Sequence, residues 1–385
     1  MQKAGDLMSS DIMSPALVRF HEKDVFPSLE QALNDLEQDF QKNLCEMKKQ
    51  YIECFKIICL NTAKIQENGQ SRIGFLIFHL LRTRILSHDY TYAVMAYDKD
   101  WYLNEGVRVG EADFSFIYKH YEELWKKLER ESKKYIGQIN GADIEGIMLK
   151  LLNPFHLYVA ELMRCSLLET LETSEYEALD REKHFEIQTG EYFELCDLVH
   201  MEDQEKDLEE RRQRLEQSKD QSCCFQDFRN LDLKGQSYCG RDLRYADFRK
   251  SSMEEIQLRN CLLIGARFKE SDLRGASLMV SMIHDASFEK ADLTRGKLQY
   301  CVAFTGKNHA NEWKNTGFTG VSFKNAILKE ADFSGATIMG GDFEGADLRG
   351  AIFKDAVLYR SRFNKKQLDE CEFSQEQLEQ IKLLP

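Results

Sequence analysis

A five-residue period runs through the C-terminal part of the chain. Reading every fifth position from Phe228 to Phe363 gives 28 residues, of which 26 are large and apolar. Two positions earlier in each unit, 22 of 28 residues are small. Neither the 3.6-residue period of a helix nor the two-residue period of a flat strand produces this pattern. It predicts a chain that turns a corner in every unit, with the large residue inside a coil and the small residue against a tight wall.

Four such units make a square coil, and successive coils stack through backbone hydrogen bonds. The segments ADFRKSS, SDLRGAS, ADLTRGK, ADFSGAT and ADLRGAIF resemble the A-(D/N)-L-x-x units of the pentapeptide-repeat family. The resemblance covers about 140 of the 385 residues. It implies a right-handed quadrilateral β-helix over residues 222–365. Because the ends of such a stack expose unpaired backbone, we expect caps.

Two segments depart from the repeat. Residues 301–315 lose the pattern but keep its phase, because 15 residues equal three units; they form either an irregular coil or a loop. At the other end, Ser374 and Gln377 have the spacing of a capping box. Leu378, Ile381 and Leu384 then predict a short amphipathic helix within residues 366–385, which closes the last coil or pairs with a second copy.

The N-terminal half predicts an all-α domain over residues 27–200, preceded by a flexible N-terminus at 1–26. Apolar residues recur from Leu29 to Ile65 at a mean step of 3.6, which indicates one long helix with a buried stripe. We expect 91–97 and 101–103 to form a small hairpin. No family resemblance is found in this half. The further predicted helices are 72–86 in the middle of a bundle, 114–135, 144–171 with a bend at Pro154, and 192–200.

Residues 201–221 carry a run of charges with opposite signs four residues apart, which supports an exposed helix. Met201, Leu208 and Leu215 are seven residues apart, the spacing of a minimal dimer seam. A solvated connecting helix is the simpler interpretation, and we favour it.

Composition indicates a folded, soluble protein: 43% of residues are hydrophobic and 11% aromatic. We expect a cytoplasmic location, because no signal peptide is evident and the eleven cysteines lack CxxC or disulfide-framework spacing. The apolar run 75–81 is too short to span a bilayer. The net charge of −13 is uneven: residues 1–227 carry −15, 228–365 carry +5 and 366–385 carry −3.

Candidate chemistry is sparse, and we expect no cofactor, no metal and no enzymatic activity, although an unrecognised activity in the helical half stays open. Phosphate-binding glycine loops and nucleophile elbows are absent. Each isolated group has a simpler interpretation as a packed, surface or junction residue. These groups are Cys196 with His200 at metal-ligand spacing, His156 with Glu161, His184 with Glu186 and Glu191, the buried His79, and the vicinal pair Cys223 and Cys224.

Outward residues of the repeat sort into faces if positions 20 apart stack. One face carries a basic ladder: Arg229, Arg249, Lys269, Lys329 and Arg349. Another is nearly uncharged and is our candidate interaction face: Met279, Val280, Tyr300, Met339, Val357 and Tyr359.

These features favour a non-catalytic scaffold that binds a protein, with a possible homodimer through the C-terminal helix or the helical domain. Some pentapeptide-repeat proteins mimic DNA and bind DNA gyrase or topoisomerase IV, which protects those enzymes from quinolones. That alternative requires a strongly negative rod, whereas this one carries +5. Nucleic-acid binding through the basic ladder is weaker still, because acids are interleaved with the bases. Membrane association is not expected.

Overall fold

The computed structural model describes residues 14–67, 72–194, 196–217, 222–306 and 316–384. The chain divides into two compact units. The N-terminal unit holds the described residues 14–180, 187–199 and 316–317. The repeat unit holds 181–186, 200–306 and 318–384. Within this part of the chain, every helix is too short or too polar to cross a bilayer.

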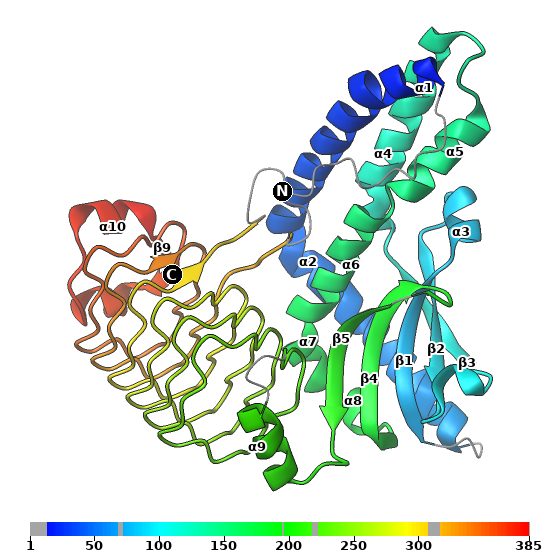
Figure 1. The fold of residues 1–385 in the computed structure, drawn as a ribbon. Helices are drawn as coiled ribbons and strands as arrows, with labels where there is room; N and C mark the ends of the chain where they lie inside the picture. Colours follow the sequence, from blue (N-terminus) through cyan, green and yellow to red (C-terminus); the bar gives the residue numbers. More distant parts are fainter. Residues whose placement is uncertain (1–13, 68–71, 195, 218–221, 307–315, 385) are drawn as a thin grey trace. The chain divides into compact units, whose positions relative to one another are not determined.

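Helices make up most of the N-terminal unit (Figure 1). In the long helix α2, Leu33, Phe40, Tyr51 and Phe55 are buried, which confirms the predicted stripe. The helical elements in chain order are α1 (Pro15–Phe20), the π-helical turn η1 (His21–Val25), α2 (Phe26–Glu67), α3 (Arg82–Leu86), η2 (Trp101–Leu103), α4 (Ser115–Ser132), η3 (Lys133–Tyr135), α5 (Gly141–Lys150), α6 (Asn153–Cys165), α7 (Leu167–Leu171) and α8 (Ser174–Glu177).

The prediction of an all-α N-terminal domain is wrong, because the chain also builds a five-stranded sheet in the order β3-β2-β1-β4-β5 (Figure 1). β1 pairs antiparallel with β2, and β2 pairs antiparallel with β3. The strands are β1 (Ile73–Leu80), β2 (Thr91–Tyr97), β3 (Val107–Asp113), β4 (Arg181–Glu191) and β5 (Cys196–Asp203).

Residues 72–86 are therefore not a bundle helix but β1 followed by the short helix α3. All eight residues of β1 are buried. A strand covered on both faces has the same continuous apolar sequence as a buried helix, so periodicity alone does not separate the two.

Three other local predictions also fail. Residues 192–200 enter strand β5 instead of a helix. The predicted hairpin partner of β2 at 101–103 is a single 3₁₀ turn, and β3 takes its place. The predicted flexible N-terminus of 1–26 lies outside the described residues up to position 13, but α1 and η1 make 15–25 helical.

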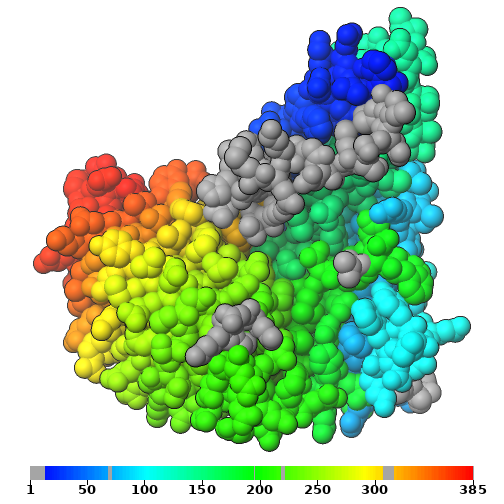
Figure 2. Space-filling model, in the orientation of Figure 1, coloured from blue at the N-terminus to red at the C-terminus, as the bar shows by residue number. Residues whose placement is uncertain are grey.

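The repeat unit is a solenoid of stacked 20-residue coils. Parallel bridges join positions 20 apart, such as Asp247 with Arg267 and Leu262 with Met282. The coils follow one another in sequence order, so the space-filling surface changes in bands from green to orange (Figure 2).

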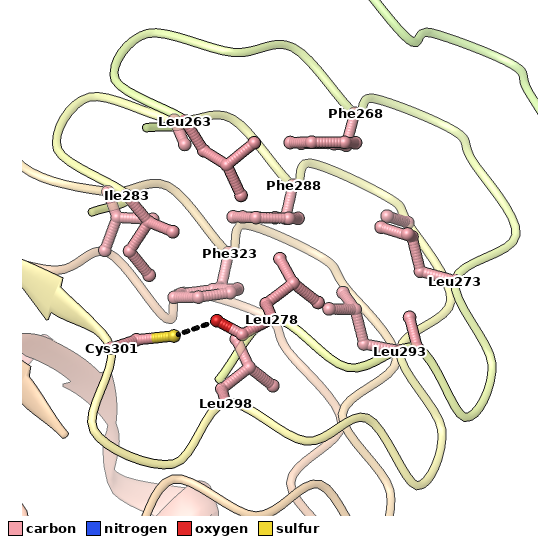
Figure 3. Close-up of a cluster of buried hydrophobic side chains, with 14 of the residues drawn as sticks. Leu263, Phe268, Leu273, Leu278, Ile283, Phe288, Leu293, Leu298, Cys301 and Phe323 are labelled. Atoms are coloured by element: carbon pink, nitrogen blue, oxygen red, sulfur yellow. Dashed lines mark hydrogen bonds between the residues drawn. The ribbon is translucent and has the colours of Figure 1, made fainter. Parts of the chain in front are cut away.

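Side chains stack inside the solenoid in columns. The planes of Phe268, Phe288 and Phe323 lie above one another (Figure 3). Ring centroids along this column are 4.6–5.2 Å apart, a separation favourable for offset stacking. The column comprises Phe228, Phe248, Phe268, Phe288, Phe323, Phe343 and Phe363.

Serine and cysteine occupy small inward slots for a specific reason. The Ser271 hydroxyl donates to the carbonyl of Phe248 at 2.6 Å, and the Cys301 thiol donates to that of Leu278 at 3.0 Å (Figure 3). Each donor thus satisfies a buried carbonyl 23 residues earlier. Burial raises the pKa of Cys301 to about 12, so this thiol is an inert structural group.

The irregular segment leaves the solenoid as a loop. Val302 and Ala303 (β6) still belong to a coil, since they pair with Thr337 and Ile338 (β7). Gly306 and Phe318 then form a two-bond antiparallel bridge that closes the neck of the loop. Residues 307–315 lie outside the described part of the chain.

Both ends of the solenoid carry additional elements (Figure 1). Helix α9 (Leu208–Gln217) precedes the first coil, and its Leu215 is buried with the solenoid core. Met201 lies in β5, so the spacing of Met201, Leu208 and Leu215 does not form a helical seam. After the last coil come β8 (Arg362–Asn364), η4 (Lys365–Asp369), α10 (Gln375–Gln380) and β9 (Lys382–Leu384).

The capping box of α10 is present, as predicted. Gln377 also donates to the carbonyls of Phe353 and Ala356, which lie in the preceding coil. The helix ends at Gln380, however, and Leu384 pairs with Asn364 in a parallel strand. A continuous amphipathic helix from 378 to 384 is therefore not formed.

Corners of the coils place every fifth residue in the left-handed region. At one corner, Tyr300 has φ 58° and its ring covers Gly335 of the next coil, which has φ 66°. A Cβ on Gly335 would lie 2.5 Å from that ring, whereas a Cβ on Gly240, with φ 72°, would meet nothing within 4 Å.

We predict that Gly335→Ala destabilises the solenoid by about 1 kcal/mol more than Gly240→Ala. Both substitutions carry the cost of a positive φ, roughly 1–2 kcal/mol, but only the first clashes with a ring. Urea unfolding followed by circular dichroism measures both. In a Tyr300→Ala background the excess should vanish, and its persistence would contradict this account.

Candidate functional sites

The outward residues group into faces differently from the prediction. Before the loop, stacked positions are 20 apart, but Ser287 pairs with Ser322 and Asp292 with Ile327, which are 35 apart. The loop therefore adds 15 residues without adding three units to the coil. Every later residue lies on a different face from the one assigned by counting in twenties.

The predicted interaction face is divided by this shift. Met279 lies beside inward Leu278, and Val280 and Tyr300 occupy the corner that follows. The other three, Met339, Val357 and Tyr359, lie on the next face round the coil, since Val357 pairs with Thr337 and Thr337 with Val302.

That next face is uncharged over five successive coils, and we call it the uncharged face. Burial lowers the pKa of its one histidine, His284, to about 4, so the ring is neutral at pH 7. Val280 and Tyr300, on its bordering corner, are 55% and 60% exposed. Its members are Leu262, Ile264, Met282, His284, Val302, Phe304, Thr337, Met339, Val357 and Tyr359.

Val280 is also strained. Its φ of 61° is rare for a β-branched side chain, because the left-handed region crowds Cβ against the backbone. A valine that is both strained and exposed does not serve the folding of the solenoid, and such outliers favour a functional interpretation.

The predicted basic ladder is neither continuous nor free. Arg229, Arg249 and Lys269 follow the column of Asp247 and Arg267, whereas Lys329 and Arg349 fall on another face after the shift. Arg229, Arg249 and Arg349 each make a bidentate pair with the aspartate two residues earlier, with one bond of 2.6–2.7 Å. These pairs leave little charge available for phosphate groups.

One of these pairs belongs to a buried charged network in the repeat unit. Asp247, 1% exposed, accepts from Arg249 at 2.7 Å and lies 3.6 Å from Arg267. Arg267 donates to Nδ1 of His200 at 3.2 Å, and Nε2 of His200 lies 3.4 Å from Glu202. The network therefore ties the end of β5 to the solenoid.

The network alters the pKa of its members. Burial raises the pKa of Asp247, but Arg267 and Arg249 more than offset this and hold it far below its usual value. Burial lowers the pKa of His200 to about 4. A neutral His200 fits the geometry, because Nδ1 accepts from Arg267 while Nε2–H donates to Glu202.

Most predicted chemical groups are separated. Cys196 and His200 lie on a strand, where an i, i+4 pair is about 13 Å apart and cannot share a metal. His184 bonds Glu186 at 2.9 Å, while Glu191 bonds Arg82 instead. Among the described residues, no group of three His, Cys, Asp or Glu side chains can hold a metal ion.

The remaining predicted residues have structural surroundings. Cys223 is buried with the solenoid core, and Cys224 bonds Asp242. His79 bonds the Tyr97 hydroxyl. At the C-terminal end, Ile381 packs on the core and Leu378 is exposed; contact with a second copy through Leu378, Ile381 and Leu384 stays a prediction.

His156 belongs to a cluster that sequence reasoning missed. Its Nδ1 contacts the Tyr92 hydroxyl, and its Nε2 faces Asp197, while the predicted partner Glu161 does not take part. Tyr92, His156 and Asp197 come from β2, α6 and β5, so no local spacing could have indicated the cluster.

Comparison with known proteins supports the repeat assignment. The family described as Pentapeptide repeats matches in eight copies within 242–279, 318–355 and 342–375, and no family matches the N-terminal half. Residues 242–375 are therefore a pentapeptide-repeat region. No curated protein matches the chain.

Similar solved structures align with the solenoid only in part. A pentapeptide repeat protein from the Arabidopsis thaliana thylakoid lumen is 21% identical, over 38% of this chain and 73% of its own, with TM-score 0.18. QnrB1, a plasmid-mediated fluoroquinolone resistance protein, is 17% identical over 41% and 79%, with TM-score 0.24. HetL from the cyanobacterium Nostoc is 20% identical over 40% and 96%, with TM-score 0.12.

We predict that Asp247→Asn costs about 3 kcal/mol of unfolding free energy, because it leaves Arg249 and Arg267 buried beside a neutral amide. Asp272 makes the same bidentate pair with Arg274, but its side chain is 31% exposed. Asp272→Asn should therefore cost less than about 1 kcal/mol. Equal costs in urea unfolding would refute a special role for burial.

We also predict that His200 makes the repeat unit sensitive to acid. Its folded pKa is lowered to about 4 from 6.5, so the unfolded chain takes up the proton first. Stability is thus lost as pH falls from 6.5 towards 4, by up to about 1.4 kcal/mol per pH unit.

His200→Gln keeps one donor and one acceptor but does not titrate, so its urea midpoint should fall less steeply over this range. The exposed His88, with φ 56°, gives a matched control as His88→Asn, which should retain the wild-type slope. An unchanged slope for His200→Gln would rule out His200 as the source.

Proposed function

We propose that this protein, whose residues 242–375 carry pentapeptide repeats, is a non-catalytic scaffold that binds a protein partner along the solenoid. The observation that carries the proposal is the uncharged face, five coils long and bordered by exposed Val280 and Tyr300. Contiguous exposed apolar surface on an otherwise charged protein favours a docking site. Aromatic and aliphatic anchors are typical of interface centres.

The solenoid suits this role because it is rigid. Coils of four five-residue units lead us to infer a right-handed quadrilateral β-helix, with α9 and α10 as its caps. Its repeated backbone bonds and stacked rings hold Val280 and Tyr300 at a fixed spacing without ordering cost on binding. All cysteines of the chain are free thiols in the structure, which supports a cytoplasmic setting.

The DNA-mimic alternative fits the charge distribution less well. A mimic needs a continuous negative surface, whereas aspartates such as Asp227, Asp247 and Asp347 are neutralised by the arginines two residues later. Binding to gyrase or topoisomerase IV is therefore the second candidate, and the experiment below separates the two.

We predict that a photo-crosslinking phenylalanine derivative at Tyr300 captures one discrete partner in cells. The same group at exposed Lys234, on another face, is the matched control and should capture none. Mass spectrometry of the adduct identifies the partner: a gyrase or topoisomerase IV subunit would establish the second candidate. No adduct at Tyr300, or the same adducts at both sites, would refute the docking surface.

Val280→Asp gives an independent check. Aspartate tolerates the left-handed region better than valine, so this variant should fold at least as stably as wild type. A charge on the docking surface should nonetheless weaken binding of the captured partner at least tenfold. Unchanged affinity, measured by calorimetry, would place the partner elsewhere.

A further inference from the structure

The N-terminal unit contains a cavity of about 220 Å³ that the solenoid does not explain. It lies where β1, β4 and β5 end or begin and where α6 starts. That volume holds on the order of seven waters, at roughly 30 Å³ each, so it fits a small metabolite and not a nucleotide. Its polar lining residues are Arg82, Asn153, His156, Glu191, Glu194 and Asp197.

A chain of buried groups orients one wall of the cavity. The hydroxyls of Tyr118 and Tyr92 are 2.7 Å apart, and Tyr92 lies 2.9 Å from Nδ1 of His156. Tyr92 and Tyr118 are fully buried and His156 is 5% exposed. Three coupled side chains therefore fix the His156 ring against the cavity.

His156 has bonding capacity left on the cavity side. Its Nε2 lies 3.4 Å from a carboxylate oxygen of Asp197, but this buried nitrogen makes no hydrogen bond of good geometry within the described residues. A buried polar atom without a bond is costly, and such atoms often mark the place of a ligand.

Asp197 is held ionised at the same wall. Burial raises its pKa, but His156 and Arg164 more than offset this and keep it below the usual value. Arg164 lies 3.5 Å from one carboxylate oxygen and is further fixed by the carbonyl of Leu198. The Asp197 side chain remains 37% exposed, so it can still accept a bond from a ligand.

The charges that face the cavity are unbalanced. Arg82, its one arginine, is engaged by both carboxylate oxygens of Glu191. Glu194 and Asp197 then remain, together with the Asn153 amide and the His156 nitrogen. An anionic ligand would have to approach two carboxylates, whereas a cation with several N–H donors would satisfy them.

We propose that this cavity binds a small organic cation bearing an ammonium or guanidinium group. The group donates to the carboxylate of Asp197 and to Nε2 of His156, and Glu194 supplies the second negative charge. Nδ1–H of His156 then donates to Tyr92, and Tyr92 donates to Tyr118. The site is independent of the solenoid surface, so either proposal can fail without the other.

The test is isothermal titration calorimetry of the full chain with n-butylammonium and methylguanidinium chloride. At least one cation should bind, while 1-butanol and butyrate, matched in size but neutral or anionic, should not. Absence of binding by both cations at 50 mM, roughly the upper limit for a weak fragment site, would overturn the proposal. Equal binding of butanol or butyrate would overturn it as well.

Variants locate the site. Asp197→Asn should weaken cation binding at least tenfold, and the exposed Glu194→Gln should weaken it several-fold without affecting folding. Glu145→Gln removes an exposed carboxylate from α5, away from the cavity lining, and should change nothing. If Glu194→Gln and Glu145→Gln bind equally to wild type, the cation binds elsewhere and the assignment is wrong.

Discussion

Backbone stacking between coils is the constraint on which the repeat unit depends. Each coil donates and accepts along its whole length, so equivalent residues of successive coils must share one backbone conformation. Large residues then stack on large residues, as in the column from Phe228 to Phe363. Small residues stack on small ones, and side chains such as Tyr300 can lie over a corner only where the next coil has glycine. The five-residue pattern records this constraint, which is why the repeat was predictable from the sequence.

The same constraint explains what the pattern could not reveal. An insertion of three whole units keeps the phase of the inward residues, so the loop after Gly306 leaves no trace in the periodicity. It nevertheless changes the stacking distance from 20 to 35, and every outward residue beyond it moves to another face. The predicted interaction face combined residues of two faces for this reason. Inward positions depend on the period alone, whereas outward neighbours depend on the number of residues in each coil.

The N-terminal unit was predicted less well because its elements are specified by tertiary contacts. The stripe of α2 is long enough for its period to be unambiguous, but β1 is short and buried on both faces. The cavity was beyond reach for a related reason. Tyr92, His156 and Asp197 are separated by 64 and 41 positions, and none belongs to a motif with a fixed spacing. Each looked like an isolated packed residue, and only the pairing of the sheet with α6 makes them neighbours.

Net charge was a poor guide to the surface for the same structural reason. An aspartate two residues before an arginine lies on the same outward face of a coil, so the two form a bidentate pair in place of two exposed charges. A repeat region with a net charge of +5 therefore presents mostly neutral pairs. Against that background, five coils with no ionised side chain form the most distinct surface of the solenoid. The regular pairing of charges elsewhere makes the uncharged face a feature that a partner can distinguish.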